Sequence, residues 1–195
     1  MIGLSKAVLV APDAWREVAR LNKLSNINQI RPGQHLSIPA RLMRSEVVGA
    51  TLFSVVGDVQ MAGAPAVAGS TIAEGQAVQT GAAGSAVVAL ADGSQVRIPP
   101  SSLAEVAASR SYGQPQGNTT EGGRGWFAGT LRVLRGSVEI FATEVLRAKP
   151  LEVITPTAVI GVRGTHFRVA FDDDAKSLSH AEVIEGKVRR SATKR

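Results

Sequence analysis

Three histidines are the residues in this sequence best suited to catalysis or metal binding. His35, His166 and His180 lie far apart along the chain, and none has a second ligand at the spacing of a metal site. The acidic run 172–174 lacks the downstream glycine and glutamate of a calcium loop. The chain has no cysteine, which excludes disulfides and thiolate ligands. We therefore expect surface or turn histidines, a solvated acidic turn and no bound metal.

Nucleophilic and phosphate-binding patterns are equally scarce. No serine lies in a nucleophile elbow or in a recognisable set with a histidine and an acid. The glycine-rich run 122–125 does not join a strand to a helix, as a phosphate-binding loop does. The sequence therefore predicts a protein without a cofactor that is not an enzyme.

The charge balance does not select a partner. Lysines and arginines exceed acidic residues by 22 − 16 = +6, but they are scattered along the chain. Such scatter favours a solvated basic surface, and the few aromatic residues count against nucleic-acid binding. No window holds the run of about 18 apolar residues that a membrane span needs. The first residues do not have the form of a signal peptide.

Residues 12–22 have the strongest helical pattern in the chain. Trp15, Val18 and Ala19 share one face of the predicted helix. After an asparagine-rich loop, Pro32 and Gly33 predict a type II turn, followed by a short strand over 34–38.

The segment Trp15 to Pro39 also resembles the second half of a LysM domain, in the pattern W-x-x-V-A-x-L-N-x-L-S-N-x-N-x-I-x-P-G-Q-x-L-x-I-P. The family's first strand and first helix have no counterpart in residues 1–11, so either the natural start lies upstream or the module has decayed. The resemblance, over residues 12–39, implies binding of N-acetylglucosamine-containing glycans such as peptidoglycan. It implies a sugar-binding wall at Leu24, Ser25, Asn26, Ile27 and Asn28. Turn formation by these asparagines explains the same residues equally well.

From residue 47 onward the sequence pattern is typical of short strands joined by turns. An aliphatic-x-Gly-x-Val signature occurs at 55–59, 134–138 and 184–188, and each copy predicts a strand, a tight turn at glycine and a returning strand. In the segment 85–98, pairing Leu90 with Val96 buries all the apolar residues on one face and requires an odd-numbered loop at Asp92-Gly93-Ser94. The run 109–125 is poor in apolar residues and predicts a surface loop.

The stretch 151–171 contains the most regular β pattern. Ile160, Val162, Phe167 and Val169 are expected on its buried face. Pro156 is expected at a strand start or an edge, and the glycines at 161 and 164 at a bend, bulge or close approach. Arg163 lies between these glycines, and we interpret it as a structural clamp between strands; gripping a ligand carboxylate is the alternative.

Residues 47–190 resemble the FecR domain of bacterial envelope proteins, through Gly57-Asp58-Val59, residues 73–81, Asp92-Gly93-Ser94 and Leu134-x-Gly136-x-Val138. The most specific string, T-P-x-A-x-x-G-V-R-G-T-x-F, contributes the motif residues Thr155, Pro156, Gly161, Val162, Arg163, Gly164, Thr165 and Phe167. The resemblance implies a mainly β domain of stacked short strands, solenoid- or sandwich-like, preceded here by a small helix-plus-strand LysM remnant. It also implies a periplasmic or secreted location.

These observations predict a LysM-like module over 1–45, a FecR-type β domain over 46–190 and a basic tail over 191–195. The expected function is that of a non-enzymatic cell-envelope protein that associates with peptidoglycan. Its β domain is expected to bind a protein or glycan partner, with strand addition to an exposed sheet edge as one mode. The alternative is a periplasmic signalling domain of the anti-sigma type, related to iron-transport regulators.

Overall fold

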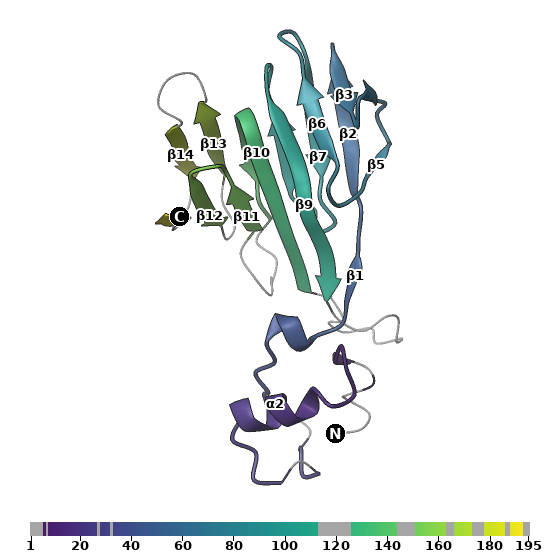
Figure 1. Cartoon of the computed structure of the whole chain (residues 1–195), viewed down its shortest axis with the longest axis vertical. Helices are drawn as coiled ribbons and strands as arrows, with labels where there is room; N and C mark the ends of the chain where they lie inside the picture. The colour runs from purple at the N-terminus through teal and green to yellow at the C-terminus, as the bar shows by residue number, and fades with distance from the viewer. Residues whose placement is uncertain are drawn as a thin grey trace. The chain divides into compact units, whose positions relative to one another are not determined.

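The computed structural model of the chain contains two compact units (Figure 1). It describes residues 6, 8–26, 28–31, 33–112, 126–143, 151–162, 166–172, 178–185 and 188–192. The smaller unit contains residues 1–46 and 111–126, and the larger contains 47–110 and 127–195. We call the larger one the β unit.

The smaller unit is built on one short helix, α2 (Trp15–Leu21), which lies inside the predicted range. Val18 and Ala19 are its buried residues, as the apolar pattern predicted. The helix ends in a Schellman motif, in which the Leu24 N–H donates to the Ala19 carbonyl and Lys23 has a positive φ of 51°. A 3₁₀ turn, η1 (Ala40–Leu42), follows later in the chain.

The strand predicted over 34–38 is not formed, and these residues lie outside any strand. Side chains satisfy the backbone there, since Asn22 accepts from the Ser37 N–H at 2.7 Å and donates to the Ser37 carbonyl at 2.8 Å. The turn before it agrees with type II geometry, with φ +83° at Gly33 and a bond from the Gln34 N–H to the Arg31 carbonyl. Pro32 lies outside the described residues.

The rest of the described chain is mainly β, as predicted. Its strands are β1 (Ser45–Val47), β2 (Ala50–Val56), β3 (Val59–Met61), β4 (Ala64–Pro65), β5 (Thr71–Ile72), β6 (Ala77–Thr80), β7 (Ser85–Ala89), β8 (Gln95–Ile98), β9 (Leu103–Tyr112), β10 (Trp126–Phe141), β11 (Leu151–Ile154), β12 (Ala158–Val162), β13 (His166–Asp172), β14 (Leu178–Glu185) and β15 (Val188–Ala192). The predicted surface loop at 109–125 is wrong over its first four residues, which extend β9; residues 113–125 lie outside the described part.

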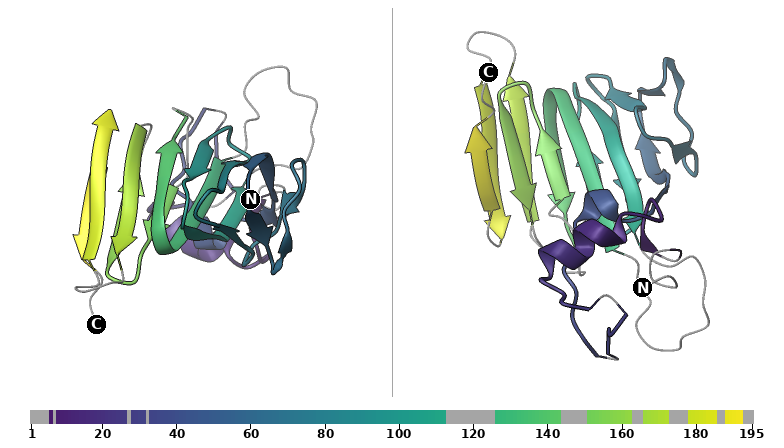
Figure 2. Two further views of the ribbon diagram at one scale, coloured as in Figure 1. Left: turned by 90° about the horizontal axis from the view of Figure 1, so that it is seen from above. Right: turned by 60° about the horizontal axis from the view of Figure 1, so that its bottom comes forward.

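The long strand β10 belongs to two layers of the β unit. Its first half pairs with β9 and β11, within a layer ordered β4-β3-β6-β9-β10-β11-β12-β15. Its second half pairs with β8 and β13, within a layer ordered β5-β2-β7-β8-β10-β13-β14. We call these the first and second layers. Figure 2 shows the strand colour advancing from teal to yellow across the first layer. The β10–β11 pair is parallel, whereas the other pairs of known register are antiparallel.

One hydrophobic core lies between the layers. Val153 and Ile160 contribute from the first layer, and Val138 and Phe167 from the second, each with 1% or less of its surface exposed. The predicted buried face of the 151–171 stretch is confirmed, since Ile160, Val162, Phe167 and Val169 are all buried. Apolar residues at every second position therefore place each strand with one face inward.

The three glycine signatures mark crossings between layers rather than the predicted hairpins. β2 lies in the second layer and β3 in the first, so Gly57 carries the chain from one layer to the other. Gly136, with φ +74°, lies where β10 passes from the first layer to the second. β14 and β15 are likewise in different layers, although 186–187 lie outside the described residues. The hairpin prediction failed because tertiary packing against two layers decides where a strand goes after a glycine.

The β7–β8 hairpin has an odd-numbered loop, as predicted, but its two strands pair in a different register. Val88 pairs with Val96, and the Leu90 N–H donates to the Ser94 carbonyl, so the loop is 91–93. The loop is odd-numbered, and the alternative two-residue turn is not formed. Gly93 has φ +84°, which is typical of a three-residue loop with a G1 bulge. The register therefore differs by two residues from the prediction while the same side chains remain buried.

Candidate functional site

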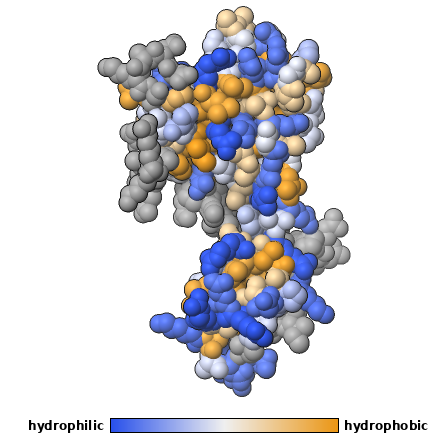
Figure 3. Space-filling view, viewed as in Figure 1, coloured by the Kyte–Doolittle hydropathy of each residue, from blue (hydrophilic) through white to orange (hydrophobic). Residues whose placement is uncertain are grey.

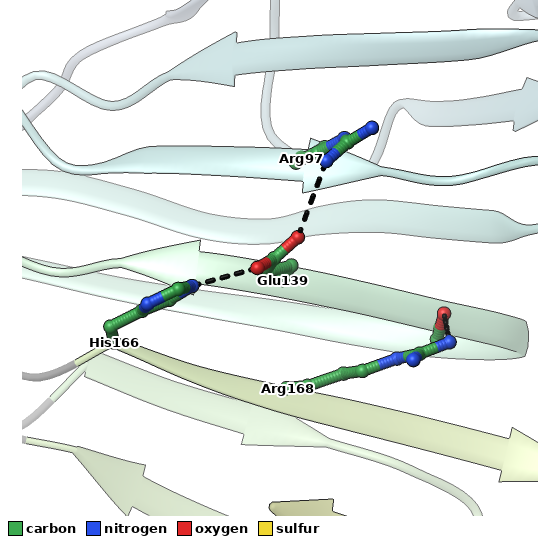
Figure 4. Close-up of polar contacts among 5 residues, drawn as sticks. Arg97, Glu139, His166 and Arg168 are labelled. Atoms are coloured by element: carbon green, nitrogen blue, oxygen red, sulfur yellow. Dashed lines mark hydrogen bonds and ion pairs between the residues drawn. The ribbon is translucent and has the colours of Figure 1, made fainter. Parts of the chain in front are cut away.

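A polar cluster occupies the outer face of the second layer, where β8, β10 and β13 run side by side (Figure 4). Glu139 lies at its centre, because the buried neighbours Val138 and Ile140 force the residue between them outward. One Glu139 oxygen is 2.7 Å from Nε2 of His166, and the other is 3.7 Å from a guanidinium nitrogen of Arg97. The carboxylate thus joins groups from both neighbouring strands.

The strand register extends this cluster into a row of alternating charge. Glu139 is opposite Arg97 on β8 and opposite Arg168 on β13, and Arg168 is opposite Glu182 on β14. Directly opposed residues on one face of a sheet lie close enough to interact, and opposite charges there are favourable. Arg168 also donates to the Ser137 hydroxyl at 3.3 Å.

An aromatic platform adjoins the row. The rings of Phe141 and His166 stack with centroids 4.0 Å apart and planes inclined by 23°. Phe141 remains 43% exposed. A partly exposed ring beside arginines is the composition that protein-binding surfaces favour over the rest of a protein surface. We call Arg97, Glu139, Phe141, His166 and Arg168 the second-layer cluster.

The outer face of the first layer also holds apolar side chains. Its outward side chains Leu103, Leu134, Ile154 and Val159 are only partly buried, and Figure 3 shows apolar residues gathered in the middle of the face of the β unit that it presents. One ion pair crosses this surface, in which Arg132 donates to both oxygens of Glu105 at 2.7 and 2.8 Å.

Glu74 anchors the end of β9. Its carboxylate accepts from the Ser109 N–H at 2.8 Å and from the Arg110 guanidinium at 3.1 and 3.2 Å. Partial burial alone raises the pKa of a carboxyl, but the Ser109 hydrogen bond and the Arg110 charge outweigh it and lower the pKa of Glu74. Glu74, which belongs to the motif at 73–81, therefore has a structural role, because it holds the end of β9.

The remaining motif residues make buried hydrogen bonds within the β unit. At the crossing, the Ser102 N–H donates to the Thr80 hydroxyl at 3.0 Å, and the Ser137 N–H donates to the Ser102 hydroxyl at 3.1 Å. A Cβ on Gly136 would lie 2.4 Å from that Ser102 oxygen. The close approach requires glycine, and the hydroxyls satisfy backbone groups where the strand changes layer.

The Asp-Gly-Ser loop closes onto the end of β10. Asp92 accepts from the Ser94 N–H at 2.9 Å, and the Thr143 N–H donates to the buried Ser94 hydroxyl at 3.1 Å. The Thr143 hydroxyl in turn donates to the Asp92 carbonyl at 3.0 Å. This motif therefore fastens a loop to a strand from a distant part of the sequence.

The Thr-Pro motif makes the β11–β12 turn. Pro156 lies in the two-residue loop between the strands, rather than at the strand start or edge that was predicted. The Ala158 N–H donates to the buried Thr155 hydroxyl at 2.9 Å. The same hydroxyl is 2.6 Å from that of Ser179 on β14, so the motif joins the layers. Gly161 continues β12 without a break in register, contrary to the predicted bend or bulge. The arginine clamp and the glycine and threonine at 163–165 lie outside the described residues.

The residues predicted to bind sugar lie in the loop after α2. Leu24 takes part in the helix cap, and the Asn26 side chain accepts from the Asn28 N–H at 2.9 Å, as an asparagine in a turn does. Ser25 and Asn28 are exposed, and Ile27 lies outside the described residues. Glycan binding by this loop stays a prediction.

The second-layer cluster was not identified from the sequence. His166 was expected at the surface or in a turn, and it lies in a strand with 26% of its side chain exposed. The alternation of Ser137, Glu139 and Phe141 with buried valine and isoleucine could have placed these three on one face. Their partners on β8 and β13 are set by register, which one strand's sequence does not contain. Within the described residues, no group of three or more histidines and acids could hold a metal ion.

Comparison with protein families gives a match to the FecR protein family over residues 76–189. This match covers more than half of the chain, and the chain belongs to the FecR family. It does not include residues 12–39. No curated protein matches.

One solved structure is similar, a putative anti-sigma factor from Parabacteroides distasonis, with 16% identity and a TM-score of 0.38. The similarity covers 59% of this chain and 50% of that one, so the chain matches about half of that protein's length. Among the helices of the described residues, none is long and apolar enough to cross a membrane.

Proposed function

We propose that this chain is a non-catalytic regulatory protein of the bacterial cell envelope, located in the periplasm or secreted, and that its β unit binds a protein partner. Membership in the FecR family is the observation that carries this proposal. The motifs of the resemblance support binding rather than catalysis, because Thr80, Ser94 and Thr155 are buried and hydrogen-bonded within the fold.

The second-layer cluster is the surface we assign to the partner. It combines a partly exposed aromatic ring with two arginines that emerge from a rigid sheet. Aromatic residues and arginine are the residues most enriched at the energetic centres of protein interfaces. Because opposite charges alternate along Arg97, Glu139, Arg168 and Glu182, the surface suits a partner segment whose own charges alternate in the complementary order.

Regulation is tested by comparing transcripts of the native host with and without the gene for this chain. A restricted set of transcripts should change on deletion, and a double variant, R97E/R168E, should reproduce that change while melting within a few degrees of the wild type. A matched control, R132E on the first layer, should leave the transcripts unchanged. Unchanged transcripts on deletion would show that the protein is not a regulator.

Peptidoglycan association through residues 12–39 has less support, because the family match lies outside this segment and the predicted strand over 34–38 is absent. Co-sedimentation with insoluble peptidoglycan, comparing the full chain with one that starts at Glu46, separates the two functions. Pelleting of the full chain alone would assign glycan binding to the smaller unit. Equal pelleting of both would assign it to the β unit or to charge, which a salt titration distinguishes.

A further inference from the structure

Among the described residues, five strands have one paired neighbour each in the topology: β1, β4, β5, β14 and β15. An open strand edge is a template for pairing with another chain, and proteins block such edges by shortness, proline or charge. β1 contains three residues and β4 and β5 contain two each, and β4 includes Pro65. β15 contains two arginines, Arg189 and Arg190, among its five residues.

β14 has neither the shortness nor the proline that protects the other edges, and its charged residues are Glu182 and Glu185. It is eight residues long and contains no proline, and its outermost position beside β13 is visible in Figure 1. Its pairing with β13 is regular from Leu178 to Val183, and a bulge at Ile184 ends this stretch. Leu178, Val183 and Ile184 are 47%, 42% and 51% exposed. The strand thus presents apolar side chains beside an edge that pairs with no other strand of the described residues.

The order of residues along β14 matches an antiparallel copy of itself. A twofold axis perpendicular to the sheet leaves the two faces of the sheet unchanged, so the residues that pair across the axis must point to the same face. Their sequence numbers must therefore differ by an even number. Centring the axis on Ala181 places His180 opposite Glu182 of the second copy, twice by symmetry, and Ser179 opposite Val183. Centring it on Glu182 opposes two carboxylates, and centring it on His180 places Leu178 opposite Glu182. Of these three registers, only the one centred on Ala181 avoids both mismatches.

We propose that β14 is a dimerisation edge, and that a second copy of this chain pairs with it antiparallel about Ala181, which extends the second layer across the twofold axis. The exposure of His180, Ala181 and Glu182 leaves all three free to meet their counterparts. The row Arg97, Glu139, Arg168 and Glu182 would then continue with a contact between Glu182 and His180 of the other copy. This inference does not depend on the proposed regulatory function, since it concerns the assembly of the chain with itself.

Sedimentation velocity of the full chain, over about 5 to 200 µM, tests the proposal because short interfaces give weak dimers. We expect a concentration-dependent dimer. H180E places two carboxylates together at both symmetric pairs and should weaken the dimer about tenfold. The double variant H180E/E182K places opposite charges at both pairs and should recover the wild-type affinity. A monomer throughout, or a dimer unaffected by H180E, would overturn the proposal.

A cysteine at the twofold axis gives a second readout that fixes the register. The chain has no cysteine of its own, so A181C introduces a single thiol. In the proposed register the two Ala181 Cα atoms lie at a separation that a disulfide spans, whereas Glu182 and its copy are diagonal neighbours about 7–8 Å apart. Oxidation with diamide should cross-link A181C well above E182C. Equal cross-linking of the two variants would contradict the Ala181 register, and capture of a different protein in place of the second copy would contradict the proposal itself.

Discussion

The two units of this molecule are stabilised by different means. In the smaller unit, the buried apolar residues among those described are Leu9, Val18, Ala19 and Met43, and side-chain hydrogen bonds hold the loop after α2. In the β unit, a continuous core lies between two layers, and buried hydroxyls fasten the places where strands cross or turn. A residue's contribution to stability therefore depends on long-range packing in the β unit, and on a few side-chain hydrogen bonds in the smaller unit.

The largest effect is expected at the crossing in β10. G136A adds a Cβ at φ +74°, only 2.4 Å from the Ser102 hydroxyl and 2.7 Å from the Ser101 carbonyl. We expect a loss of about 3 kcal/mol or more in the free energy of unfolding, measured by urea denaturation. Gly63 is the matched control, because it has φ +81° with nothing within 4 Å of its Cβ position. G63A should cost about 1 kcal/mol, and equal losses would show that the close approach is unimportant.

Removing the Thr155 hydroxyl, which connects the two layers, should give the next largest effect. T155V keeps the shape of the side chain but removes the hydroxyl that accepts from the Ala158 N–H and contacts Ser179. We expect a loss of about 1–3 kcal/mol, because a buried backbone donor loses its partner. T51V on the exposed outer face is the control and should change stability by less than about 0.5 kcal/mol.

In the smaller unit the corresponding test is N22A. This change removes both bonds to Ser37 and the bond to the Val18 carbonyl, at 2.8, 2.7 and 2.8 Å. We expect a local loss of about 1–2 kcal/mol, seen as faster hydrogen exchange over 15–39 with unchanged exchange in the β unit. N28A is the control. Faster exchange throughout the chain would mean that the two units do not open independently.

The smallest effect is expected at Glu74, through pH. The folded-state pKa of this carboxyl is lowered, so its contribution to stability is present above the unfolded pKa and is lost as pH falls through the folded value. E74Q should therefore lose stability relative to the wild type near neutral pH, and the difference should shrink in acid. Urea denaturation from neutral pH down into the acidic range measures this, and a constant difference would contradict it.

Part of this protein follows from the sequence alone. Alternating apolar residues placed Ile160, Val162, Phe167 and Val169 in the core, because a strand's period of two fixes which side chains share a face. The helix around Val18 and the odd-numbered loop at Gly93 followed from local patterns for the same reason. Family membership was also carried by short motifs that can be read along the chain.

Only the tertiary structure decided where those elements meet. The three glycine signatures look like hairpins in the sequence, yet each leads from one layer to the other, since the glycine specifies a backbone conformation and not a pairing partner. The cluster around Glu139 and the hydrogen bonds of Ser94 and Thr155 join residues that are distant in sequence. The openness of β14 is likewise a property of the whole sheet, because a strand becomes an edge only when no other strand takes the place beside it.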